Sequence, residues 1–196
     1  MELTQSFTVA HPRAVVWAYF ADVDAVARCM PGAALSEPVS GNSLKGTIAV
    51  RLGPISAAFT GEGEFERDDA GFRGVIRGSG RDNKTGSRAK GEVAYVLAEE
   101  DGGAATRVEV SVAFTLAGPL AQFGRAGIVN DLAARLTAEF ASNLEARLDQ
   151  AAAGEAAGEA AAREPAPAAE LDAGALVFSI IWQRIKAFFA GLFGRG

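Results

Sequence analysis

Between residues 44 and 116 the chain alternates apolar and polar residues in five successive stretches, and this pattern most constrains the fold. Strict alternation over such lengths is typical of β-strands with one buried face, and the Gly, Asp and Pro residues between the stretches favour turns. The five stretches are Leu44–Leu52, Ile55–Glu66, Phe72–Arg81, Ser87–Leu97 and Thr106–Leu116. Leu3–Val9 alternates in the same way, and a short strand is expected near Ala34–Val39. The sequence therefore predicts a meander of antiparallel strands.

From Pro119 the apolar period changes from two residues to four. The apolar positions are Ile128, Leu132, Leu136, Phe140, Leu144 and Leu148. This spacing predicts a long amphipathic helix with a single face to bury, and two short helices are expected earlier, one after Pro12 and one capped by Asp22. Strands followed by a helix that covers them predict an α+β protein. The specific expectation is a helix-grip fold, in which a curved antiparallel sheet wraps round a long C-terminal helix.

The strand face that is expected to point inward mixes large apolar residues with many glycines. Glycine weakens a strand, so its presence needs a reason. One reason is curvature, since glycine lets a sheet bend, and the other is room for a ligand between sheet and helix. The sequence leaves both open. Since no charged residue is expected to face inward, the predicted cavity suits a flat, apolar ligand.

The predicted cavity draws on the first helix, the strands and the start of the long helix. Its expected lining is Trp17, Phe59, Gly61, Gly63, Phe65, Phe72, Gly74, Ile76, Gly78, Gly91, Tyr95, Val110, Phe114, Leu116, Phe123 and Gly127.

Residue types that carry catalysis are scarce in this chain. The one histidine, His11, precedes a proline and is interpreted as a helix cap or surface residue, and the one cysteine, Cys29, has no partner histidine. No cluster has the spacing of metal ligands. We therefore expect no catalytic residues, no metal and no covalent cofactor. A net charge of −5 makes nucleic acid an unlikely partner.

A basic segment covers residues 73–90, with six Lys or Arg residues against the single acid Asp82. It is interpreted either as a solvated turn or as a surface that an acidic partner protein docks on, where the charge mainly steers association. The candidate docking residues are Arg77, Arg81, Lys84, Arg88 and Lys90.

The last part of the chain divides into a linker and an amphipathic tail. Residues 150–175 are mainly Ala, Gly, Glu and Pro, which cannot bury enough apolar surface to order themselves, so a disordered linker is expected. On a helical wheel, residues 176–196 place their apolar side chains, except Leu176 and Ile180, on one arc with two cations at its edges. The predicted membrane-binding residues are Phe178, Ile181, Trp182, Arg184, Ile185, Lys186, Phe188, Phe189, Leu192 and Phe193.

The orientation of this tail follows from its two cations. A spanning helix would place Arg184 and Lys186 at mid-depth, at about 2.5–3.5 kcal/mol each, whereas a helix lying flat lets both reach the headgroups. We therefore expect a peripheral anchor. The alternative is that the tail folds back on the body or pairs with a partner helix.

Four further stretches are distinctive, namely VVWAYFADVDAVARCMPGAAL, KGTIAVRLGPISAAFTGEGEF, GSGRDNKTGSRAKGEVAYVL and GPLAQFGRAGIV. Together and in this order they resemble the CoxG family, which is associated with carbon monoxide dehydrogenase. The resemblance covers residues 1–148, and the family is similar to the START-like (SRPBCC) helix-grip superfamily, whose members mostly enclose apolar ligands. It implies an accessory protein of molybdenum hydroxylases such as carbon monoxide dehydrogenase, one that recruits the enzyme to the membrane.

These lines combine into one expectation. Residues 1–149 form a START-like ligand-binding domain, 150–175 a linker and 176–196 a membrane helix. The protein is expected to be cytoplasmic, on the inner face of the cell membrane, and to bind a respiratory quinone, menaquinone or ubiquinone, so that electron transfer links its partner enzyme to the quinone pool. The alternatives are a ligand-free anchor or assembly factor and, less favoured, an enzyme of the polyketide-cyclase type.

Overall fold

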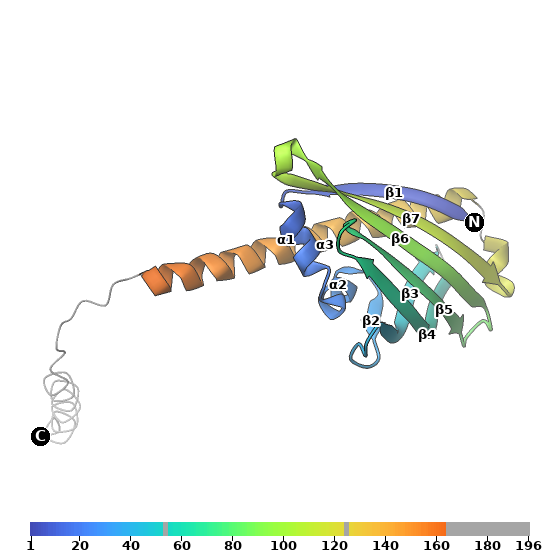
Figure 1. Ribbon diagram of the computed structural model, residues 1–196. Helices are drawn as coiled ribbons and strands as arrows, with labels where there is room; N and C mark the ends of the chain where they lie inside the picture. Colours follow the sequence, from blue (N-terminus) through green and yellow to red (C-terminus); the bar gives the residue numbers. More distant parts are fainter. Residues whose placement is uncertain (53–54, 124–125, 164–196) are drawn as a thin grey trace, which may run out of the picture. The chain divides into compact units, whose positions relative to one another are not determined.

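A single curved antiparallel sheet of seven strands is the framework of the molecule (Figure 1). The computed structural model describes residues 1–52, 55–123 and 126–163, so the predicted membrane helix and residues 164–175 of the predicted linker lie outside the described residues. The strands are β1 (Glu2–Val9), β2 (Ala33–Leu35), β3 (Ser43–Leu52), β4 (Ile55–Asp68), β5 (Arg73–Asp82), β6 (Arg88–Glu100) and β7 (Ala105–Ala117). Their order in the sheet is β1-β7-β6-β5-β4-β3-β2.

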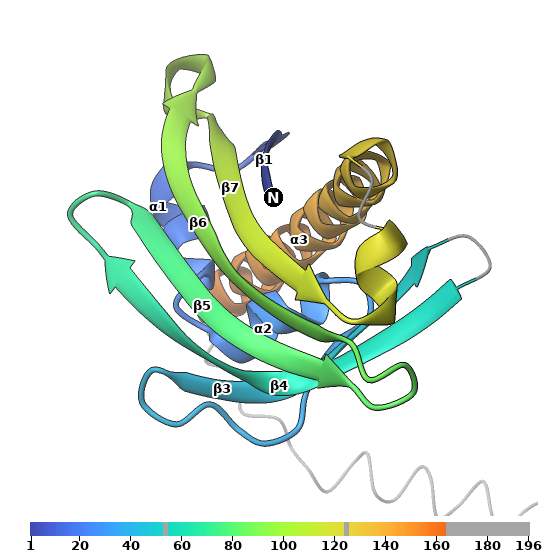
Figure 2. The same cartoon turned by 90° about the vertical axis from the view of Figure 1, so that its right-hand side faces the viewer.

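The helices lie on the concave side of this sheet (Figure 2). They are α1 (Arg13–Tyr19), α2 (Val23–Cys29) and α3 (Ala126–Arg163), with short 3₁₀ turns η1 (Asp101–Gly103) and η2 (Pro119–Phe123). Asp22 caps α2 as expected, since its carboxylate accepts a hydrogen bond of 2.9 Å from the backbone N–H of Ala25. The predicted α+β helix-grip arrangement is confirmed.

The helix α3 is longer than the sequence pattern predicts. The apolar period ends at Leu148 and a disordered linker is expected from residue 150, yet α3 continues to Arg163. The reason is composition, because Ala and Glu favour helix strongly enough to offset the two glycines in this stretch. The linker prediction is therefore wrong for residues 150–163. Residues 1–155 form one compact unit.

Pairing between the strands places the inward-facing residues in rows that cross the sheet. Two neighbouring rows consist mainly of glycine. One runs Gly80–Gly61–Gly46 and the other runs Gly91–Gly78–Gly63, across strands β3 to β6. Large apolar side chains flank these rows along the strands, so the glycines form a floor without side chains in the middle of the concave face.

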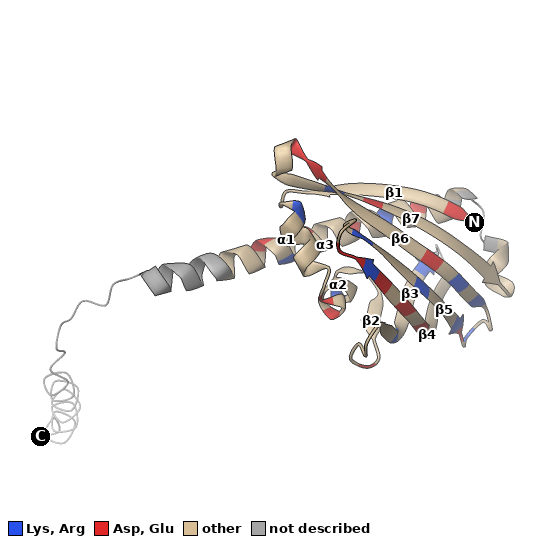
Figure 3. Ribbon diagram, in the orientation of Figure 1, with Lys and Arg blue, Asp and Glu red and all other residues tan. Residues whose placement is uncertain are grey.

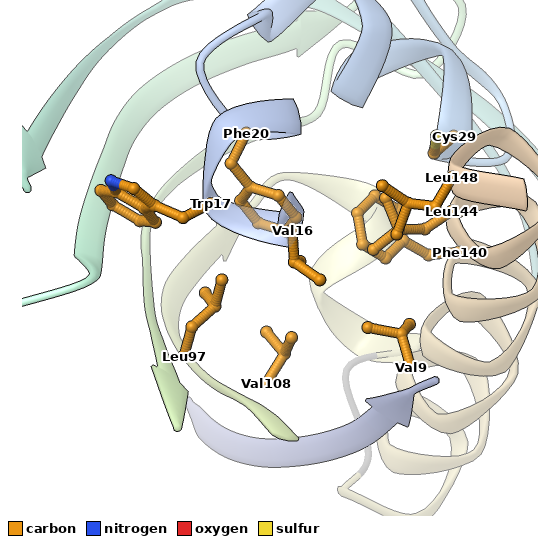
Figure 4. Close-up of a cluster of buried hydrophobic side chains, with 10 residues drawn as sticks. All are labelled: Val9, Val16, Trp17, Phe20, Cys29, Leu97, Val108, Phe140, Leu144 and Leu148. Carbon is orange, nitrogen blue, oxygen red and sulfur yellow. The ribbon is translucent and has the colours of Figure 1, made fainter. Parts of the chain in front are cut away.

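One end of the concave face holds a fully packed core, which we call the closed end (Figure 4). It joins α1, α2 and the middle of α3 to the sheet at β1, β6 and β7. The closed end consists of Val9, Val16, Trp17, Phe20, Cys29, Leu97, Val108, Phe140, Leu144 and Leu148, each at most 8% exposed. Burial on this scale stabilises by roughly 1.5–3 kcal/mol for each large side chain.

The hairpin that joins β5 to β6 is hydrogen-bonded to η2, the turn that precedes α3. Its two buried polar residues, Asp82 and Ser87, are 2% and 0% exposed. Asp82 accepts hydrogen bonds from the Lys84 backbone and the Thr85 hydroxyl, and the Ser87 hydroxyl oxygen accepts one of 3.0 Å from the backbone N–H of Leu120. Asp82 thus organises the turn, while Ser87 ties it to η2, from which the chain enters α3.

Candidate functional site

At the end of the concave face opposite the closed end, large apolar side chains point inward without being buried; we call this the open end. Phe59, Phe114 and Leu116 are half-buried there, and Ile48, which pairs with Phe59 across the strands, is 50% exposed. Leu132 and Leu136 of α3 are half-buried as well. Folding normally buries such side chains, and a concave apolar surface with few polar groups is how small-molecule sites are built. The open end is therefore the candidate ligand site.

The glycine floor next to the open end has a steric cause. A Cβ on Gly61 would strike the backbone carbonyl oxygen of Ser79 on the neighbouring strand, and a Cβ on Gly91 would lie 2.9 Å from that of Ala113. The strands therefore approach too closely for any other residue at these positions. At these two positions the structure therefore shows a steric reason for glycine, the close approach of the neighbouring strand. The absence of side chains above the floor is a consequence of this requirement.

The predicted cavity residues fall into two groups. At the open end or on the floor that leads to it lie Phe59, Gly61, Gly63, Phe65, Ile76, Gly78, Gly91, Phe114 and Leu116. Trp17 belongs to the closed end, and Phe72, Tyr95 and Val110 pack against it. Gly74 lies beneath the Tyr95 hydroxyl. Gly127 is exposed on α3, and the side chain of Phe123 lies outside the described ones.

An inward-facing cation is present that the sequence analysis missed. The predicted strand ended at Glu66, but β4 continues to Asp68, so the alternation carries the side chain of Arg67 to the concave side. The expectation that no charge faces inward is therefore wrong. The Arg67 guanidinium carbon lies 4.1 Å from the centre of the Trp17 ring. Continuing the alternation by one residue beyond Glu66 could have revealed that the side chain of Arg67 faces inward.

Arg67 and Trp17 share a carboxylate at the edge of the sheet. The Trp17 indole N–H donates to Asp69 Oδ1 at 2.8 Å, and Arg67 Nη2 donates to the same oxygen at 3.1 Å. These two hydrogen bonds, that from Arg67 above all, lower the pKa of Asp69. Burial raises the pKa of the Tyr95 hydroxyl, and the nearby charge of Arg67 partly offsets this. At neutral pH the group therefore comprises a carboxylate, a guanidinium and a neutral phenol.

Figure 3 shows the Lys and Arg positions on strands β5 and β6. Four of the predicted docking residues alternate with the inward-facing positions of these strands and therefore face outward, namely Arg77, Arg81, Arg88 and Lys90, whereas Lys84 lies in the turn between the strands. Arg77 is bound by two carboxylates, with Glu66 at 2.9 Å and Glu92 at 2.7 Å, and these hydrogen bonds raise its pKa. Arg81 and Arg88 are direct cross-strand partners. Like charges placed opposite each other destabilise a sheet, so this pair suggests a role other than stability.

A hollow of about 600 Å³ surrounds that arginine pair on the outer face. Its lining includes Lys45, Glu62, Arg81, Arg88 and Lys90. Lys45 is paired with Glu37 at 2.9 Å. Among the described residues, no ion pair involves Arg81, Arg88, Lys90 or the exposed Lys84 of the hairpin turn. We call Arg81, Arg88 and Lys90 the basic hollow.

The single histidine and the single cysteine have structural roles. His11 Nε2 bonds to Asp149 of α3 at 3.0 Å, and the neighbouring Glu145 accepts from the backbone N–H of Ala10. The ligand atoms of these three side chains lie within 4.8 Å of one another, as a divalent cation would require, but the hydrogen bonds account for their arrangement. His11 does not cap α1, whose N-cap is Pro12. Cys29 is buried in the closed end.

One family model matches most of the chain. The model of the CoxG family, whose members are described as a subunit of carbon monoxide dehydrogenase, matches residues 6–149, which include every described strand except the first residues of β1. No curated protein matches the sequence. In the part of the chain that the structure describes, none of the helices combines the length and the apolar character that crossing a membrane requires.

Solved structures share the fold at low sequence identity. A conserved protein of Geobacillus kaustophilus has a TM-score of 0.66 and 13% identity, with 76% of this chain and 96% of that chain covered. An aromatase/cyclase of Streptomyces sp. R1128 has a TM-score of 0.54 and 16% identity, with 76% of this chain and 94% of that chain covered. A START superfamily protein of Mycobacterium smegmatis has a TM-score of 0.50 and 14% identity, with 76% of this chain and 97% of that chain covered. These likenesses establish the START-like fold and nothing about activity.

Proposed function

Because the chain belongs to the CoxG family of carbon monoxide dehydrogenase, we propose that it is a non-catalytic accessory protein of a molybdenum hydroxylase of the carbon monoxide dehydrogenase type. In this proposal the open end binds a respiratory quinone, menaquinone or ubiquinone. The tail at residues 176–196 holds the protein on the inner face of the cell membrane, where quinone is taken up, and the bound quinone links the enzyme to the quinone pool.

The observation that carries the proposal is the contrast between the two ends of one interior. Phe140, Leu144 and Leu148 of α3 are buried against the sheet, whereas Leu136 and Leu132, one and two turns earlier than Phe140, are only half-buried. Leaving apolar surface in water costs about 25 cal/mol for each Å². An apolar ligand that covers the open end would recover this free energy, and a flat ring with an isoprenoid chain has the required character.

The partner is proposed to dock on the outer face, where the basic hollow faces away from the ligand. Arg81 and Arg88 lie side by side, and neither forms an ion pair with another described residue, so an acidic segment of the hydroxylase would relieve their mutual repulsion. Rim charges of this kind mainly increase the rate of association and make it sensitive to salt. A ligand-free anchor or assembly factor would need this surface and the tail but not the open end.

An enzyme of the cyclase type is not favoured. Catalysis of that kind needs a positioned proton acceptor. Arg67 can only donate, the pKa of Tyr95 is raised, and Asp69 is engaged by Arg67 and Trp17. Asp82, which faces inward at the open end, is buried and bonded within its own turn.

Filling the open end tests the ligand proposal. Val93 of β6 faces inward beside Ile76 and Val112, whereas Val96 of the same strand faces outward and is 38% exposed. We expect Val93→Trp to weaken binding of a short-chain ubiquinone at least tenfold, because the indole takes the ligand's place, and Val96→Trp to leave it unchanged. Isothermal titration of the full chain measures both. Equal binding by the two variants would refute a ligand that extends from the open end into the interior beside Val93.

A further inference from the structure

Arg67 is held in place by one of its nitrogen atoms, while another has no partner in the described part of the chain. Nη2 donates to Asp69 Oδ1 at 3.1 Å and to the Trp17 carbonyl oxygen at 3.4 Å. Nη1 is buried and has no hydrogen-bond partner among the described residues, and no other buried side-chain nitrogen or oxygen there lacks one. Leaving a buried donor unpaired costs about 1–3 kcal/mol, more for a charged group. A donor that is oriented and yet unpaired suggests that its acceptor comes from a ligand.

Tyr95 directs a second polar group to the same place. Arg67, Gly74 and Tyr95 form one inward-facing row across β4, β5 and β6. Gly74 lacks a side chain, and the Tyr95 hydroxyl leans over it, so closely that a Cβ on Gly74 would collide with it. The Tyr95 side chain therefore extends toward Arg67. None of the hydrogen bonds among the described residues involves this hydroxyl, and the effect of Arg67 on the pKa of Tyr95 is consistent with their proximity.

This row lies on the border between the two ends of the interior. On the closed side Tyr95 packs against Phe20 and Trp17, with ring centres 5.3 and 6.4 Å apart. On the other side the next inward-facing row contains Phe65 and Ile76, which lead to the glycine floor and the open end. A molecule that enters with its apolar part at the open end would meet these two donors at its innermost point.

The two donors define the chemistry of that innermost part. A guanidinium only donates hydrogen bonds, and a neutral phenol donates one, so the ligand must offer an acceptor. Asp69 already balances the charge of Arg67, which favours a neutral oxygen over an anion. Resting on the proposed function, we propose that Arg67 and Tyr95 bind a carbonyl oxygen of the quinone ring, and that the ring therefore binds first and deepest while its chain extends to the open end.

The test compares two probes of the same shape. 2,3-Dimethyl-1,4-naphthoquinone has the two carbonyl oxygens, and 2,3-dimethylnaphthalene has the same bicyclic frame without them. For the full chain we expect Arg67→Met to weaken binding of the quinone about tenfold or more, and Tyr95→Phe about three- to tenfold, as expected for the loss of a charged and a neutral hydrogen bond. Binding of the hydrocarbon should change less than twofold in both variants.

Matched variants control for general damage. Arg13 also stacks on an aromatic ring, with its guanidinium carbon 4.0 Å from the centre of Phe72, and Tyr19 is the only other tyrosine in the chain. Arg13→Met and Tyr19→Phe should bind both probes as the natural chain does. Tyr95→Phe keeps the ring that packs on Phe20, so it remains informative if Arg67→Met fails to fold.

The outcomes separate this inference from the function it rests on. If the natural chain binds neither probe, the proposed function fails. If it binds the quinone and both variants bind it equally well, the quinone site stands and the roles of Arg67 and Tyr95 are refuted. Absorbance titration in the Tyr19→Phe background adds an independent readout, because removing the charge of Arg67 should raise the pKa of Tyr95 further. An unchanged pKa would contradict their proximity.

Discussion

Two leucines of α3, eight residues apart, give a direct measure of how the interior is filled. Leu144 is 0% exposed in the closed end, whereas Leu136 is half-buried at the open end. We predict that Leu144→Ala lowers the free energy of unfolding of the ligand-free protein by about 3 kcal/mol, within the range of 2.7–5.0 kcal/mol that buried leucines show. Leu136→Ala should lower it by about 1 kcal/mol, because water already reaches this side chain and no closed cavity forms.

The assay is urea unfolding of delipidated full-length protein, followed by circular dichroism and analysed by linear extrapolation. Both substitutions remove the same atoms from the same helix, so differences in helix propensity cancel. Repeating the measurement with quinone adds a second comparison, since a ligand at a hundred times its Kd stabilises by about 2.7 kcal/mol. Leu136→Ala should reduce this gain and Leu144→Ala should not. If Leu136→Ala costs as much as Leu144→Ala without ligand, the open end is already packed and the reasoning is wrong.

Two further predictions concern the surfaces outside the interior. Arg81→Glu combined with Arg88→Glu should slow association with the partner hydroxylase at least tenfold at low salt, measured by surface plasmon resonance. An association rate that changes neither with these substitutions nor with the salt concentration would exclude docking at the basic hollow. Phe188→Asp combined with Phe189→Asp should abolish flotation with anionic vesicles, because two charges then enter the apolar face of the tail. Undiminished flotation would remove the membrane role of residues 176–196.

The strands were predictable because alternation is a local property. All five long stretches occur as strands within a few residues of the predicted bounds, and Asp22 caps α2 as expected. The errors occurred where polar residues continued an element. Arg67 lies beyond the last clear apolar position of its strand, and residues 150–163 contain no large apolar side chain.

The candidate site was less predictable than the fold, and for a physical reason. Alternation shows that Phe59 and Leu97 both face inward, but only the folded structure shows that Phe59 is half-buried whereas Leu97 is 2% exposed. The role of glycine at position 61 depends on the carbonyl oxygen of Ser79, which the local sequence does not reveal. The placement of Tyr95 over Gly74 depends in the same way on strand register.

The most direct test of the central claim, that the open end holds an apolar ligand, is mass spectrometry of lipid extracted from the full-length protein. The protein should be isolated from quinone-containing membranes without detergent and compared with the Val93→Trp variant. The account predicts quinone approaching one molecule per chain in the natural protein and severalfold less in the variant. Protein that is consistently free of quinone, or a variant that carries as much as the natural chain, would contradict it.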